Sequence, residues 1–187
     1  PAEDIAERMA HLEQIAMRLE VKEGKNGCVI INDSYNSDLA SLDIALDFMS
    51  RRSEDKGKKR TLILSDMLET GQSSKLLYRQ VAELVHSRGV EKIIGVGDEI
   101  RTASSRFELE KYFFHSTEDL LKSDLLPNLR NEVVLIKGSR SFHFDDVSER
   151  LELKVHETIL EIKLNALVDN LNYYRCKLKP ETKMVCM

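Results

Sequence analysis

The densest cluster of reactive side chains in this sequence follows a short apolar run at residues 28–31. Five consecutive polar residues, 32–36 (NDSYN), supply one carboxylate, two amides and two hydroxyls. Asn, Asp and Ser also cap helices and make ordinary turns, but a single turn needs fewer such groups than are found here. Polar density directly after a buried strand therefore favours a ligand site that binds through hydrogen bonds.

A second motif, KGSRS at residues 137–141, follows another apolar run. Backbone N–H groups near Gly138 and Ser139 are free to face an anion at such a turn, and Lys137 and Arg140 add positive charge. A Gly-containing turn with two solvated cations accounts for the same residues equally well. Spacing alone leaves both interpretations open.

A third motif, SDMLETG at residues 65–71, provides two carboxylates, Asp66 and Glu69. Paired acids hold a metal ion or an ammonium group, although acids also favour the start of a helix for its dipole. We slightly favour a substrate site, because this turn should line the same crevice as the first motif. By contrast, GVGDE at residues 95–99 lacks the GxGxxG spacing of a dinucleotide site and indicates a tight turn, and nothing matches a P-loop.

The elements that must position these motifs alternate along the chain. Apolar runs at residues 28–31, 61–64, 92–97, 111–115 and 132–139 predict strands. Helical spacing predicts helices at residues 3–17, 39–49, 73–88, 117–125 and 145–153, with a short helix from Asp98, and the charged residues 21–27 predict a turn. This alternation predicts an α/β fold with a mainly parallel, Rossmann-like sheet covered by helices on both faces. The strand ends should then bring the motifs to one edge.

Composition narrows the class of protein. The 187 residues include 28 Lys and Arg against 32 Asp and Glu, a net charge of -4, which argues against a nucleic-acid binder. No apolar run approaches the roughly 18 residues that span a bilayer, and the first residues do not resemble a signal peptide. We therefore expect a cytoplasmic protein without membrane insertion. Three cysteines without CxxC spacing predict neither a disulfide framework nor a zinc site.

The last residues follow a different pattern. Residues 157–163 alternate like a strand, residues 164–178 carry an amphipathic helical stripe, and KMVCM at residues 183–187 looks like the start of another strand. This opening cannot close a core of its own, so we expect it to dock on the first domain or to be poorly ordered. Because the chain begins with Pro and stops inside an apolar run, we expect both ends to be cuts from a longer protein.

Five motifs, in this order, resemble the C-terminal domain of Mur ligases: MRLE (17–20), NDSYN, SDMLETG, GVGDE and KGSRS. Within the family, the chain is most similar to the member that adds D-alanyl-D-alanine to UDP-N-acetylmuramoyl-tripeptide, because related ligases tend to carry His in the NDSYN segment. The resemblance implies an ATP-driven amide ligase of peptidoglycan precursor synthesis that works through an acyl phosphate. Another Mur-type or folylpolyglutamate-type ligase, or a non-catalytic α/β nucleotide-binding module, remains an alternative.

The resemblance also implies roles for individual residues. Asp33 would accept hydrogen bonds from the ATP ribose, and Arg18 would approach the phosphates. The nucleotide-binding set is Arg18, Asn32, Asp33 and Tyr35. The substrate-binding set is Asn36, Ser37, Asp66, Glu69, Lys137, Ser139 and Arg140, with the dipeptide carboxylate assigned to Arg140. ATP and Mg²⁺ would be held mainly by the family's central domain, which carries the P-loop, so we expect this piece alone to be inactive and to contain neither a catalytic residue nor a metal site.

The sequence departs from the family pattern at two places near these residues. Residues 36–39 read Asn-Ser-Asp-Leu where the family usually has Asn-Ala-Asn-Pro, and Ser65 stands where the family usually has Gly. The nucleotide assignment survives both changes. Contacts from Ser37 and Asp38 are left open.

Residues 156–187 resemble the beginning of alanine racemase, in which a strand and a helix precede the first barrel strand. The resemblance implies a fused ligase and racemase whose pyridoxal phosphate lysine would come just after Met187. A generic amphipathic helix after the domain is the alternative. The predicted domains are therefore the end of a central ATPase domain (1–17), a Mur ligase C-terminal domain (18–153) and the start of a racemase domain (154–187).

Overall fold

The computed structural model describes residues 18–54, 57–68, 71–154 and 163–183. The chain divides into two compact units, Pro1–Leu153 and Lys154–Met187. The predicted helix at residues 3–17 and most of the predicted strands at 157–163 and 183–187 lie outside the described residues. In the second unit, helix α7 (Leu164–Lys177) forms where a helix was predicted. No helix within the described ranges is long and apolar enough to cross a membrane.

The first unit is built on a six-stranded sheet with the order β1-β2-β6-β3-β4-β5. The strands are β1 (Glu20–Glu23), β2 (Val29–Asp33), β3 (Lys59–Ser65), β4 (Lys92–Val96), β5 (Glu110–Phe114) and β6 (Glu132–Lys137). Strands β2 to β6 pair in parallel, and β1 pairs antiparallel with β2. The predicted α/β fold with a mainly parallel sheet is confirmed.

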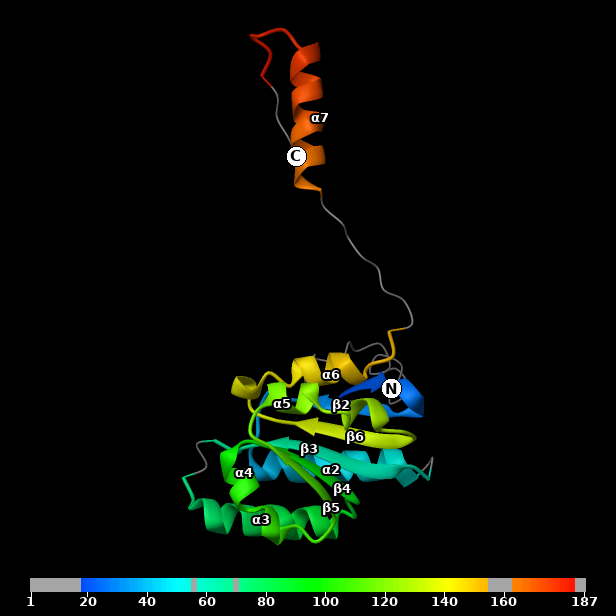
Figure 1. Cartoon of the computed structure of the whole chain (residues 1–187), viewed down its shortest axis with the longest axis vertical. Helices are drawn as coiled ribbons and strands as arrows, with labels where there is room; N and C mark the ends of the chain where they lie inside the picture. The colour runs from blue at the N-terminus through cyan, green and yellow to red at the C-terminus, as the bar shows by residue number, and fades with distance from the viewer. Residues whose placement is uncertain (1–17, 55–56, 69–70, 155–162, 184–187) are drawn as a thin grey trace, which may run out of the picture. The chain divides into compact units, whose positions relative to one another are not determined.

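Helices cover both faces of the sheet, with α2 and α3 on one side and α5 and α6 on the other (Figure 1). The helices are α2 (Leu39–Glu54), α3 (Ser74–Ser87), α4 (Asp98–Thr102), α5 (Thr117–Lys122) and α6 (Asp145–Leu151); the 3-10 turns are η1 (Lys25–Gly27), η2 (Ser104–Arg106), η3 (Leu126–Asn128) and η4 (Arg140–Phe142). Two apolar cores result. Leu62 and Leu64 of β3 enter one core and Ile63 enters the other, because successive side chains of a strand point to opposite faces.

The first strand corrects the prediction of a turn at residues 21–27. Residues 20–23 form β1, with Glu20 opposite Asn32 and Glu23 opposite Val29. The segment is too charged to show an apolar alternation, and its strand conformation comes from backbone pairing at the sheet edge, where charged side chains are favoured. Local sequence therefore carried little signal for this strand.

Residues next to α2 and α3 determine where α2 begins and where α3 ends. Asp38 precedes α2, and its Oδ1 accepts a hydrogen bond from the Ser41 backbone N–H at 2.8 Å. This satisfies one of the first N–H groups of the helix, which have no partner within it. Gly89 follows α3 with φ of 65°, a left-handed conformation that favours glycine at a helix end.

Candidate functional site

The crevice beyond β2 and β6 lies where the chain leaves the sheet toward opposite faces. Strand β2 leads into α2 on one face, and its parallel neighbour β6 leads into α6 on the other (Figure 1). Such a point in a parallel sheet leaves a crevice at the carboxyl ends of the strands, where ligands bind. Asp33 and Lys137 are the last residues of these strands and are register partners.

A buried ion pair closes the floor of this crevice. The Lys137 ammonium lies 2.7 Å from Asp33 Oδ2 and donates to the Asn36 carbonyl at 2.5 Å. Lys137 is 1% exposed and Asp33 is 9% exposed, so each charge needs the other. The structure thus gives Lys137 an internal role that fixes Asp33 and the following loop. A direct contact between Lys137 and a substrate stays a prediction.

The two carboxylate oxygens of Asp33 differ in their contacts. Lys137 uses Oδ2, and no described residue hydrogen-bonds to Oδ1. Asp33 also lines a pocket of about 270 Å³, whose walls are Arg18, Leu19, Asp33, Tyr35, Asn36, Ser41, Ile44 and Lys137. A pocket of this size accommodates a ribose, and a carboxylate oxygen without a partner suits its hydroxyl groups. Ribose binding by Asp33 stays a prediction.

Two arginines from distant parts of the chain meet at one aromatic ring above this pocket. The Arg18 and Arg140 guanidinium carbons lie 4.9 and 4.8 Å from the centroid of the Tyr35 ring. Both distances are within the range of attractive cation–π contacts. The structure therefore brings together residues that were predicted to serve the nucleotide (Arg18, Tyr35) and the dipeptide (Arg140).

Several polar side chains in and after the NDSYN segment are engaged within the protein. Asn32 is buried, and its Oδ1 accepts a hydrogen bond from the Ser34 hydroxyl at 2.7 Å, which also approaches Asp145. Ser37 is buried too, and its hydroxyl has no hydrogen-bond partner among the described residues. Hydrogen bonds from the Ser41 backbone and hydroxyl lower the pKa of Asp38. Ligand contacts from Asn32 and Ser37 stay predictions.

Asp66 caps a neighbouring helix. Its Oδ1 accepts from the Ile100 backbone N–H at 2.8 Å and from the Tyr78 hydroxyl at 3.2 Å, and its Oδ2 accepts from the Glu99 N–H at 3.2 Å. Burial raises the pKa of the Tyr78 phenol, so Tyr78 remains a donor. A Cβ atom on Gly97 would lie 2.3 Å from this carboxylate, which explains the glycine in GVGDE. Substrate binding by Asp66 stays a prediction.

Ser65, which stands where the family pattern has glycine, links the ends of β3 and β6 through hydrogen bonds. The Ser65 hydroxyl is fully buried, donates to the Asp66 carbonyl and accepts from the Ser139 backbone N–H at 3.0 Å. That N–H is one of the groups predicted to face an anion, and here it already has a partner. The predicted roles of Ser139 and Asn36 in substrate binding are not tested, and Glu69 lies outside the described residues.

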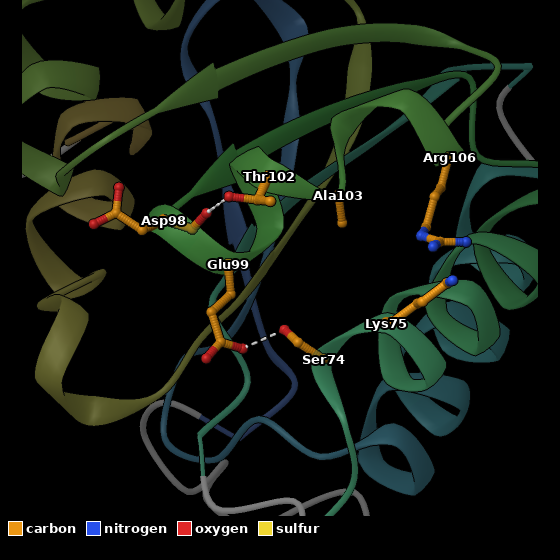
Figure 2. A pocket seen from close by; sticks show the side chains of 7 residues that line it. All are labelled: Ser74, Lys75, Asp98, Glu99, Thr102, Ala103 and Arg106. Atoms are coloured by element: carbon orange, nitrogen blue, oxygen red, sulfur yellow. Dashed lines mark hydrogen bonds between the residues drawn. The ribbon is translucent and has the colours of Figure 1, made fainter.

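A second pocket, of about 510 Å³, was not predicted from the sequence. Its lining residues, drawn in Figure 2, are Ser74, Lys75, Asp98, Glu99, Thr102, Ala103 and Arg106. The Glu99 carboxylate accepts a hydrogen bond from the Ser74 hydroxyl at 2.7 Å across the pocket. The lining comes from α3, α4 and η2, so no contiguous motif marks it. Among the described residues, no group of three His, Cys, Asp or Glu side chains is placed to hold a metal ion.

The fold is that of an α/β domain with a mainly parallel sheet and a crevice at the carboxyl ends of β2 and β6. Residues 17–140, more than half of the chain, match the family model described as Mur ligase, glutamate ligase domain. The chain therefore belongs to the Mur ligase family and contains its C-terminal domain.

Several relatives are UDP-N-acetylmuramoyl-tripeptide–D-alanyl-D-alanine ligases. The Escherichia coli protein is 25% identical over 145 residues, and the Bacillus subtilis protein is 28% identical over 155 residues; these alignments cover 77% and 80% of this chain but 31% and 33% of those proteins. The chain thus spans about a third of the length of these relatives. The crystal structure of Thermotoga maritima MurF ligase in complex with ADP is 22% identical, with a TM-score of 0.61 over 75% of this chain and 31% of that one. At this identity the structural likeness shows the fold.

Proposed function

We propose that this chain is the C-terminal domain of a ligase that adds D-alanyl-D-alanine to UDP-N-acetylmuramoyl-tripeptide. The relatives that carry this name support the substrate assignment. The observation that carries the proposal is the buried Asp33–Lys137 pair, because it uses only Oδ2 of Asp33 and both residues line a pocket beyond the ends of β2 and β6. In this reaction the γ-phosphoryl group of ATP would pass to the tripeptide carboxylate and leave ADP. The dipeptide amine would then attack the acyl phosphate, and the amide would form as inorganic phosphate and a proton leave.

In this mechanism the residues of the domain bind and orient. Asp33 accepts hydrogen bonds from the ribose through Oδ1, while Lys137 holds the carboxylate in place through Oδ2. Arg18, on the rim of the same pocket, places positive charge near the phosphates, where negative charge develops as the phosphoryl group moves. The P-loop and the Mg²⁺ ligands belong to the central domain of the family, so this chain alone would be inactive. Residues 1–17 would be the end of that central domain.

The test is ligation by the full-length protein. Purified protein is supplied with ATP, UDP-N-acetylmuramoyl-tripeptide and D-alanyl-D-alanine, and the product is followed by mass spectrometry. We expect the pentapeptide product with wild type and a loss of at least tenfold in kcat/KM for ATP in Asp33→Asn. Ligation only with a single amino acid would refute the dipeptide assignment. ATP binding without any ligation would favour a nucleotide-binding module.

We also propose that residues 154–187 begin an alanine racemase domain. The support is the similarity of residues 156–187 to the start of that family and the helix α7 at the predicted place. Racemisation of L-alanine by the full-length protein, with and without added pyridoxal phosphate, tests this proposal separately. Absence of pyridoxal phosphate-dependent racemisation in a protein that ligates would overturn the fusion and leave the ligase assignment intact.

A further inference from the structure

The contact of Arg18 and Arg140 with Tyr35 joins two ends of the domain. Arg18 precedes β1, and Arg140 lies in η4 after β6, yet both guanidinium carbons are within 5 Å of the same ring centroid: 4.9 and 4.8 Å. Tyr35 is 39% exposed, and Asp33 and Asn36, which lie on either side of it in the sequence, are both bonded to Lys137. The ring is thus placed to fix the positions of both cations.

The two arginines lack a compensating carboxylate. Within the described ranges, neither Arg18 nor Arg140 forms a salt bridge. The two acids closest to Tyr35 in the sequence have other partners: Asp33 bonds to Lys137, and Asp38 bonds to Ser41 at the start of α2. Two like charges at one ring repel each other, and each cation–π contact offsets only about 0.5–1 kcal/mol at an exposed site. A bound anion shared by the two guanidinium groups would remove this repulsion.

The number of donors favours phosphate over carboxylate as that anion. One guanidinium satisfies both oxygens of a carboxylate through a two-bond fork. Two guanidinium groups supply two such forks, and a phosphate group offers enough oxygen lone pairs to accept from both. A flat ring against each guanidinium also keeps it in one orientation, which lowers the entropy lost when the anion binds.

We propose that Tyr35 is a positioning residue that holds Arg18 and Arg140 as one clamp for a nucleotide phosphate group. Arg140 therefore acts with Arg18 on phosphate and does not bind the dipeptide carboxylate. This inference rests on the proposed ligase function. It adds to that function a phosphate-binding role for Arg140 and an orienting role for the Tyr35 ring.

Steady-state kinetics of the full-length protein separate the two anions. For Arg140→Gln we expect kcat/KM for ATP to fall at least tenfold, with KM for D-alanyl-D-alanine within about twofold of wild type. Tyr35→Leu should lower kcat/KM for ATP about tenfold, because it removes two cation–π contacts. Tyr35→Phe keeps the ring and should retain most activity. Arg51→Gln is the matched control, because Arg51 lies near the far end of α2 and is 79% exposed.

Opposite results would overturn the clamp. A rise in KM for D-alanyl-D-alanine in Arg140→Gln without an effect on ATP would assign Arg140 to the dipeptide. Equal losses in Tyr35→Leu and Tyr35→Phe would show that the hydroxyl, and not the ring, matters.

Binding to the 187-residue chain provides a readout that does not depend on ligation. Titration with inorganic tripolyphosphate, followed by NMR of the arginine Nε–H signals, should move Arg18 and Arg140 together, and D-alanyl-D-alanine at equal concentration should not. If the full-length protein fails to ligate but this pattern holds, the proposed function falls and the anion clamp stands. If it ligates but wild-type chain shows no joint shift, the clamp falls.

Discussion

Replacing Lys137 by methionine tests the buried ion pair on which the candidate site depends. Lys137 is 1% exposed, and methionine fills much of its volume without a charge. The substitution leaves the Asp33 carboxylate, 9% exposed, and the Asn36 carbonyl without their donor. Breaking a buried pair on one side costs about 3–5 kcal/mol, and the lost carbonyl bond adds to the upper part of that range. We therefore expect a loss of about 4 kcal/mol in the free energy of unfolding.

Urea unfolding of the 187-residue chain at pH 7, followed by circular dichroism, measures this loss. With a slope of about 2 kcal/mol per M, the midpoint should fall by about 2 M, and Tm should fall by roughly 10 °C. The double variant Asp33→Asn/Lys137→Met should recover a large part of the loss, because no uncompensated charge remains. Lys122→Met is the control, since Lys122 forms an exposed ion pair with Glu118 and its removal should hardly move the midpoint.

Two results would refute this reasoning. A midpoint shift below about 0.5 M in Lys137→Met would show that the Asp33 carboxylate does not depend on Lys137. A double variant no more stable than Lys137→Met would show that the loss comes from packing and not from the unpaired charge.

Three further predictions concern the turns around the site. Gly97→Ala should destabilise the domain by about 2–4 kcal/mol in urea unfolding, because Gly97 has φ of 125° and a Cβ atom would meet the Asp66 carboxylate; an unchanged midpoint would contradict this contact. Asp66→Ala should cost about 2–3 kcal/mol and Asp66→Asn less, since asparagine keeps one acceptor for the Ile100 N–H; equal losses would argue against the cap. Asp38→Ala should cost about 1 kcal/mol at pH 7. Because the folded-state pKa of Asp38 lies below its usual 3.8, the carboxylate stabilises the fold above that pH, and the difference from wild type should vanish as pH falls through the lowered pKa; a constant difference down to pH 2 would refute this.

Local patterns were sufficient to predict most of the described elements of the first unit. Apolar runs of four to eight residues separated by helical stretches predicted β2 to β6, and the structure confirms each of them. Strand β1 was missed because an edge strand is specified by the backbone of its neighbour and needs no apolar alternation. The starts of α2 and α3 were predicted to within one residue, at 39 and 73 against the observed Leu39 and Ser74.

The sequence also gave the residue types of the candidate site, because a carboxylate, amides and cations at strand ends are visible in NDSYN and KGSRS. It did not give their pairing. Asp33 and Lys137 are 104 positions apart, and they meet only because β6 inserts between β2 and β3 in the sheet. Strand order depends on long-range packing and hydrogen bonding, which no local pattern reports. Tertiary structure alone therefore decided that Lys137 faces inward to Asp33 and that Arg140 joins Arg18 at the ring of Tyr35.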